Sequence, residues 1–145
     1  MISAKTFLTD EEKNKVVDTI RKIEAATTGE IRVHIDDGTT EDVLDIAVEV
    51  FYHLRMDKTV FRNGVLIYIA VKNKQFAVIG DEAINQKVTA KFWKEVSFEL
   101  NNDFKNTEPI TAILHALQTI GNQLAHYFPA LDNLDNNELP NEISF

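Results

Sequence analysis

Oxygen-bearing side chains stand at the ends of three separated segments of the sequence: Glu30, Asn63, and the pair Asp81 and Glu82. Carboxylate and amide oxygens are the ligands that hard cations such as calcium and magnesium take in proteins. If the fold brings the three segments together, the sequence predicts a calcium or magnesium site at these four residues. Arg62 lies beside them in the chain and is the candidate substrate-binding residue, because a guanidinium can neutralise negative charge that develops on a bound group.

Each of these residues also has a plain structural interpretation. Asp81 can cap a helix that follows it, and Glu82 can complement the dipole of that helix. Glu30 can form an ion pair with Arg62 or Arg32. The sequence alone leaves both interpretations open.

A second acidic set comes after the first predicted strand. Its members are Asp36, Asp37 and Asp42, with Asp45 close behind. Ligands of open parallel sheets often bind beyond the carboxyl ends of the strands, so this set is a second candidate cation cluster. Asp-Asp-Gly is also an ordinary turn sequence. The chain has no EF-hand spacing, metalloprotease helix motif or phosphate-binding P-loop, and no serine in a nucleophile context, so the catalytic residues are unknown.

The elements that position these residues centre on the run from Val65 to Val71, which is apolar at every position. Strand side chains alternate between faces, so both faces of this strand must be buried. The polar link 72–75 is short, which predicts that the strand from Phe76 to Ile79 returns antiparallel. The chain therefore enters and leaves this hairpin at the same edge of the sheet.

An earlier strand is predicted at residues 30–36, where apolar and polar residues alternate, and we expect it to be half exposed and peripheral. A helix capped by Thr40 and ending near Arg55 follows it. A strand, a helix and a buried strand form a βαβ unit with parallel strands. This geometry places Glu30 at the same sheet edge as residues 62–64 and 80–82.

The other predicted helices cover about 10–26, 90–100 and 107–128, and residues 82–88 are predicted to form a short helix or a turn. Thr9 with Glu12 forms a capping box for the helix at 10–26. Asn101-Asn102-Asp103 is expected to end the helix at 90–100, and Pro129 is expected to stop the helix at 107–128. The fold prediction is a single α/β domain over residues 1–129. It is a three-layer α/β/α sandwich with a small mixed sheet covered by helices on both faces. Residues 130–145 are predicted to be a weakly ordered acidic tail.

The amino-acid composition argues against several classes of function. The chain of 145 residues carries 15 Lys and Arg against 23 Asp and Glu, a net charge of −8, which disfavours nucleic-acid binding. No cysteine is present, so a thiol nucleophile and a cysteine metal site are both excluded. No apolar run reaches the length of a transmembrane helix, and no signal sequence is evident, so we expect a cytoplasmic protein without an organic cofactor.

Three segments in this order resemble the TPM domain family, named after a thylakoid-lumen protein, a photosystem II repair protein and an acetylcholine-receptor modulator. They are residues 28–33 (TGEIRV), 62–70 (RNGVLIYIA) and 76–81 (FAVIGD), and the resemblance spans roughly Phe7 to Pro129. It implies a mixed sheet between helices, acid phosphatase activity in some members and divalent cation binding in some.

This chain resembles the short, unanchored bacterial form of the family, and it departs from the family pattern at one position of interest. Much of the family has Asp-Asn-Gly before the central strand, whereas this chain has Arg62-Asn63-Gly64, which replaces a carboxylate by a cation. Two functions follow as hypotheses. The first is a divalent-cation-binding accessory or interaction module with an unidentified protein partner. The second is a metal-dependent acid phosphatase acting on phosphomonoesters.

Overall fold

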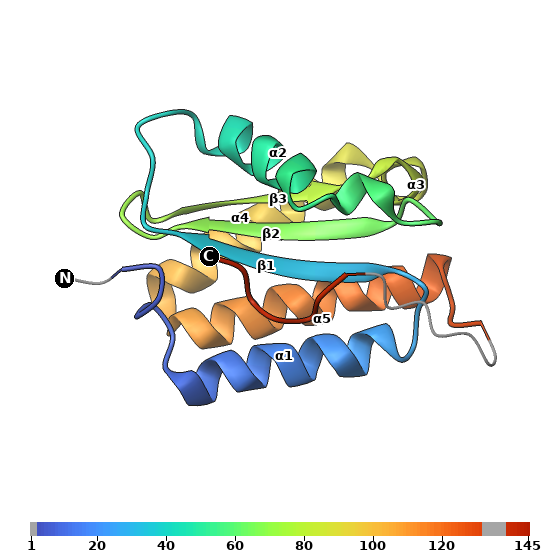
Figure 1. Cartoon of the computed structure of the whole chain (residues 1–145), viewed down its shortest axis with the longest axis horizontal. Coiled ribbons are helices and arrows are strands. Elements are labelled where there is room, and N and C mark those ends of the chain that lie inside the picture. Colours follow the sequence, from blue (N-terminus) through green and yellow to red (C-terminus); the bar gives the residue numbers. More distant parts are fainter. Residues whose placement is uncertain (1–2, 132–138) are drawn as a thin grey trace.

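A computed structural model describes residues 3–131 and 139–145 of the chain (Figure 1). The elements in order are α1 (Asp10–Glu24), β1 (Glu30–Asp36), α2 (Val43–His53), the short 3-10 helix η1 (Met56–Lys58), β2 (Gly64–Ala70), β3 (Gln75–Gly80), α3 (Glu82–Lys87), α4 (Ala90–Asn106) and α5 (Pro109–Tyr127). Figure 1 shows the sheet as a middle layer, with α2 above it and α1 and α5 below. The predicted α/β sandwich is confirmed.

Strand β2 is the centre of this architecture, and all seven of its residues are buried. Val65, Ile67 and Ile69 belong to a core with α1, α4 and α5. Leu66 and Tyr68 belong to a second core with α2 on the opposite face. The alternation predicted from the continuous apolar run is therefore realised in two separate cores, one on each side of the sheet.

The sheet has the order β1-β2-β3. Strands β1 and β2 are parallel, with Glu30 opposite Gly64 and Asp36 opposite Ala70. Strands β2 and β3 are antiparallel, with Val65 opposite Gly80. The mixed topology matches the predicted βαβ unit followed by a hairpin, and it leaves β1 and β3 as the two edge strands.

Two helix boundaries differ from the predictions. The N-cap of α2 is Asp42 and not Thr40, because the Asp42 side chain accepts the amide N–H of Asp45 at 3.1 Å. Helix α4 does not break at Asn101. It continues to Asn106 because Leu100 and Phe104 pack against the core on its inner side, and Asn101 donates back to the carbonyl of Ser97 at 2.8 Å. The capping box at Thr9 is confirmed.

The C-terminal segment covers the outer edge of β1. Ser144 accepts the amide N–H of Ile35 at 2.9 Å and donates its own to the carbonyl of Val33 at 3.0 Å, a parallel bridge alongside His34. The prediction that β1 is half exposed is therefore wrong: Glu30 and His34 on its polar face are 2% and 7% exposed. Residues 132–138 of the predicted weakly ordered tail lie outside the described residues, whereas residues 139–145 lie against the sheet.

Candidate functional site

The sheet register brings the first candidate site together at one end of the sheet. Glu30 starts β1 opposite Gly64, Asn63 immediately precedes β2, and Asp81 follows β3 and donates its amide N–H to the carbonyl of Gly64 at 2.9 Å. The prediction that these segments meet is confirmed. Their role as cation ligands remains a prediction.

Arg62 binds two members of this cluster, Asp81 and Glu82. Its Nε and Nη2 donate to the two carboxylate oxygens of Asp81 at 2.7 and 2.9 Å, and its Nη1 lies 3.4 Å from Oε1 of Glu82. The hydrogen bond with Asp81 is the main reason that the pKa of Arg62 is raised. Arg62 has a φ of 54°, a left-handed backbone that turns the chain into β2. The candidate phosphoryl-binding guanidinium is therefore paired with two of the candidate ligands.

Asp81 also has the structural role that the sequence left open. Its Oδ1 accepts the amide N–H of Glu82 at 2.8 Å, so it is the N-cap of α3. Asp81 is 6% exposed, whereas Glu82 lies on the surface. A carboxylate that is bound by a guanidinium and an amide together has few lone pairs left for another ligand.

Glu30 and Asn63 are buried members of the cluster, as Asp81 is. Oε1 of Glu30 accepts the amide N–H of Leu139 at 2.7 Å, a partner in the C-terminal segment and not the arginine considered from the sequence. Asn63 is 1% exposed and donates from Nδ2 to Oγ1 of Thr28 at 3.1 Å. Its Oδ1 is also buried but accepts no hydrogen bond from the part of the chain that the structure describes. A buried amide oxygen without a donor is the kind of group that a cation or a water molecule satisfies.

Glu24 was not among the residues singled out from the sequence. It ends α1, and its Oε2 accepts the amide N–H of Ile31 at 3.1 Å, which places its carboxyl beside the start of β1. Burial raises the pKa of Glu24 to about 8, and the nearby charge of Glu30 also raises it, while the bond from Ile31 lowers it. In the sequence, only the six-residue separation from Glu30 across a helix end could have indicated this proximity.

The second candidate cluster is not a single site, because its residues bind different parts of the chain. Asp36 lies 2.7 Å from Nε2 of His34 and accepts the Tyr68 hydroxyl at 2.7 Å. Asp37 accepts the amide N–H of Ala4 at 2.6 Å, and Asp42 caps α2. Within residues 3–131 and 139–145, no group of three or more His, Asp and Glu side chains is arranged to hold a metal ion. Neither candidate cluster is thus a complete carboxylate site, and the first one gains its further oxygen donor from Asn63.

A model of the TPM domain matches residues 2–123 of the chain. The chain belongs to the TPM domain family. The NMR structure of the BA42 protein from the psychrophilic bacterium Bizionia argentinensis superimposes with a TM-score of 0.86 and 43% identity, covering 95% of this chain and 94% of that one. No curated protein matches the chain.

More distant structures share the fold of this TPM domain. The N-terminal domain of a P. gingivalis protein has a TM-score of 0.70 at 9% identity, over 84% of this chain and 79% of that one. The N-terminal domain of a Corynebacterium glutamicum protein has a TM-score of 0.63 at 10% identity, over 81% and 74%. In the described part of this TPM domain, no helix has both the length and the apolar character needed to cross a membrane.

The raised pKa of Glu24 makes the stability of this TPM domain depend on pH. Because the pKa rises from 4.5 when unfolded to about 8 when folded, the folded state binds the proton more tightly. The contribution of protonated Glu24 to the free energy of unfolding is fully present below pH 4.5 and is lost as the pH rises to about 8. We expect Glu24→Gln, which keeps the acceptor for Ile31, to be more stable than the wild type by about 1 kcal/mol at high pH, after allowance for solvent screening.

Urea unfolding of both proteins between pH 5 and 9 measures this difference. The gap between Glu24→Gln and wild type should widen as the pH rises. A constant gap across the range would show that Glu24 titrates at its ordinary pKa. Glu11→Gln, an exposed change on the same helix, is the control and should follow the wild-type curve.

Proposed function

We propose that this TPM domain is an accessory or interaction module that binds a divalent cation, calcium or magnesium, at the sheet end formed by Glu30, Asn63, Asp81 and Glu82. The observation that carries the proposal is Oδ1 of Asn63, which is buried and has no hydrogen-bond donor among the described residues, at the sheet end that also holds the buried carboxylates of Glu30 and Asp81. Hard cations bind amide and carboxylate oxygens, so the chemistry of these donors fits calcium or magnesium.

Arg62 is the competitor that such a cation must displace. Its guanidinium holds both oxygens of Asp81, so Asp81 can bind a cation only after the arginine has moved. The Arg62 side chain is 37% exposed, which gives it room to swing into solvent. Cation binding is therefore expected to be weaker than the donor set alone would allow, and to change the position of Arg62.

A pair of matched variants tests the proposal. Asp81 and Asp42 are both N-caps, of α3 and α2, and asparagine caps a helix about as well as aspartate does. Asp81→Asn and Asp42→Asn therefore both keep a cap and both remove one charge, but only the first removes a proposed ligand. Calorimetric titration and thermal shift with calcium and with magnesium measure the binding. We expect Asp81→Asn to weaken it about tenfold or more and Asp42→Asn to leave it unchanged.

Each possible result supports or contradicts the proposed site. If wild-type protein binds neither ion at millimolar concentration, the cation proposal is wrong. If Asp42→Asn loses binding and Asp81→Asn keeps it, the cation belongs to the cluster of Asp36, Asp37 and Asp42 instead. Loss in Asp81→Asn alone supports the proposed site.

A metal-dependent acid phosphatase is the second candidate, and the half-exposed Arg62 beside these carboxylates is the observation that favours it. Because Nε and Nη2 of Arg62 are already bound to Asp81, we expect weak turnover or none. The test is hydrolysis of a chromogenic phosphomonoester from about pH 5 to 8, with added magnesium or calcium and with chelator. Activity that depends on the ion and is lost in the Glu30→Ala, Asp81→Ala double variant would establish the enzyme, whereas activity unchanged in that variant would exclude this site.

A further inference from the structure

The two edges of the sheet differ in whether another segment of the chain pairs with them. The edge of β1 is paired with the C-terminal segment at Ser144. The edge of β3 is the last in the sheet order and has no paired strand among the described residues. The sequence of β3, QFAVIG, contains none of the devices that commonly protect an edge strand, such as proline or an inward-pointing charge. Strand β3 is therefore available for pairing.

The register identifies which backbone groups of β3 point outward. Asp81 donates its N–H to Gly64, and groups alternate along an antiparallel strand, so Ala77 and Ile79 bond to β2 while Phe76 and Val78 face away. The carbonyl of Gly80, which also faces away, accepts a bond from Asn85 at 2.8 Å. For the N–H and C=O of Phe76 and Val78, the described part of the structure shows no hydrogen-bond partner. These four groups are a template for one more strand.

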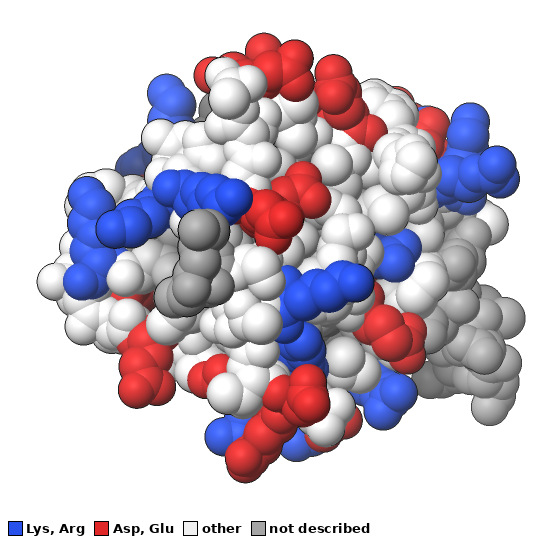
Figure 2. Space-filling view, turned by 60° about the vertical axis from the view of Figure 1, so that its left-hand side comes forward, with Lys and Arg blue, Asp and Glu red and all other residues white. Residues whose placement is uncertain are grey.

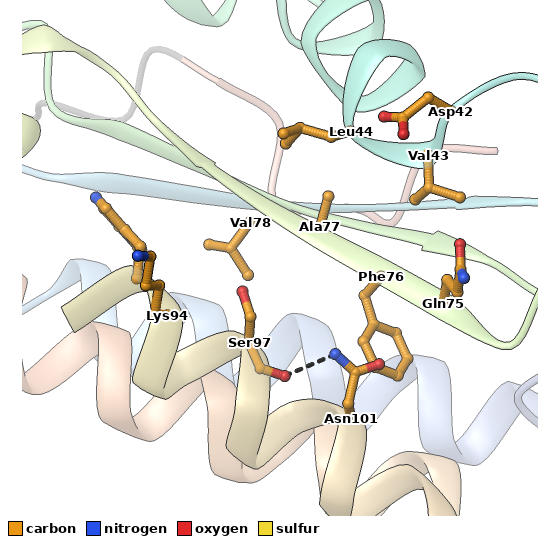
Figure 3. Close-up of a pocket in the computed structure, with 11 residues that line it drawn as sticks. Asp42, Val43, Leu44, Gln75, Phe76, Ala77, Val78, Lys94, Ser97 and Asn101 are labelled. Atoms are coloured by element: carbon orange, nitrogen blue, oxygen red, sulfur yellow. Dashed lines mark hydrogen bonds between the residues drawn. The ribbon is translucent and has the colours of Figure 1, made fainter. Parts of the chain in front are cut away.

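A groove of about 560 Å³ runs along this edge (Figure 3). Figure 3 shows the backbone of β3 between its two walls, with Leu44 of α2 and the N-cap Asp42 on one side and Lys94 and Ser97 of α4 on the other. An extended segment in the groove would have its backbone against β3 and its side chains directed alternately to the two helices.

Helix α2 carries exposed apolar side chains and negative charge, and Leu44 and Asp42 are the members of these two sets that line the groove itself. Leu44, Val48 and Tyr52 recur at helical spacing and are 55%, 39% and 58% exposed. Four exposed carboxylates lie on or just before the same helix, and none forms an ion pair within the described residues: Glu41, Asp42, Asp45 and Glu49. Figure 2 shows acidic side chains gathered at the top of the view, on the side where α2 lies in Figure 1.

We propose that the β3 edge binds an extended segment of a partner protein, rich in β-branched and basic residues, which adds to the sheet as a fourth strand beside β3. The open backbone groups provide the pairing, and the apolar residues of α2 provide contact area. The carboxylates on and just before α2 select positive charge on that side of the groove, across from Lys94 of α4. A second copy of this chain fits less well. Antiparallel pairing of β3 with its own copy places α2 against α2, so the four carboxylates would face the same four, in a chain of net charge −8.

The probe is a short synthetic peptide in which Val alternates with Lys and Thr, compared with the same peptide carrying Glu in place of Lys. Binding is followed by NMR in the presence of chelator, which keeps this test independent of the cation proposal. We expect the Lys peptide to bind about tenfold or more tightly than the Glu peptide, and less so at high salt. Amide exchange at Phe76 and Val78 should slow on binding, whereas Ala77 and Ile79 are already protected by β2.

Three changes test the mechanism separately. Methylating the peptide nitrogens that face β3 should weaken binding about tenfold without altering the protein. Val78→Pro removes one outward donor of β3 and should weaken binding similarly, with its fold checked by circular dichroism. The double charge reversal Asp45→Lys, Glu49→Lys should invert the preference to the Glu peptide, whereas the control Glu11→Lys, Asp18→Lys on α1 should not.

Several results would overturn the proposal. Failure of every peptide to bind at millimolar concentration would do so, and so would equal binding of the Lys and Glu peptides. Binding that leaves exchange at Phe76 and Val78 unchanged would place the peptide elsewhere. Protection of these two amides that rises with protein concentration, without peptide, would mean that a second copy is the partner.

Discussion

Replacing Arg62 with glutamine is expected to raise the affinity of the domain for calcium and magnesium about 10- to 100-fold, because charge-assisted bidentate pairs are among the strongest hydrogen bonds. At the proposed site, a cation must displace the guanidinium from both oxygens of Asp81 and must also approach a fixed positive charge. Glutamine removes the charge and most of the competition. Calorimetric titration of both proteins at the same ionic strength measures the change.

Arg55 offers a closely matched control. Arg55 and Arg62 both have left-handed backbones, with φ of 59° and 54°, so Arg55→Gln imposes the same backbone requirement and the same change in net charge. Arg55 is exposed and precedes η1. Its replacement should leave cation affinity unchanged. If both variants gain affinity equally, the gain comes from net charge, and the idea that Arg62 competes for Asp81 is wrong.

The second large effect concerns Asp36, whose replacement by alanine should lower the free energy of unfolding by about 3 kcal/mol, since each buried polar group left without a partner costs about 1–3 kcal/mol. Asp36 binds the hydroxyl of Tyr68, a side chain that is fully buried, and Nε2 of His34. Burial raises the pKa of Tyr68, and the bond to Asp36 raises it further, so the phenol stays protonated and donates. Urea unfolding at neutral pH measures the loss.

A double-mutant cycle separates the hydroxyl from the carboxylate. Tyr68→Phe alone should cost about 1 kcal/mol. In the Asp36→Ala, Tyr68→Phe double variant, the loss should be smaller than the sum of the single losses, because the phenylalanine leaves no buried hydroxyl without a partner. Strict additivity of the two changes would show that the 2.7 Å contact between them contributes little.

The sequence was most informative where local pattern and burial agree. The continuous apolar run at β2 predicted a central strand with two covered faces, and the parallel crossover then placed Glu30, Asn63 and Asp81 at one end of the sheet. The predicted break at Asn101 was wrong because side chains of the inner face, spaced for a helix, outweighed the preference of asparagine for helix ends. At this position, the packing of side chains against the core determined the length of the helix, although the local sequence predicted its end.

Contacts between distant parts of the chain were the features that sequence patterns missed. Nothing local indicates that Arg62 spans Asp81 and Glu82, or that Glu24 lies beside Glu30. The alternation in β1 predicted a solvated face, but that face is covered by a segment more than a hundred residues later, through Leu139 and Ser144. A hydrophobicity pattern shows that a face is polar, and it does not show which polar groups of the chain will meet it.

The segment from Leu139 to Phe145 lies beyond the region that the family model matches, which ends at residue 123. A protein that keeps all of α5 but lacks this segment would lose both the Leu139 contact with Glu30 and the Ser144 contacts with β1. Its sheet would then present unpaired backbone groups on both sides. Two different unpaired edges on one molecule favour head-to-tail association that does not close into a ring, so we expect the shortened protein to form open-ended polymers more readily than the whole chain does.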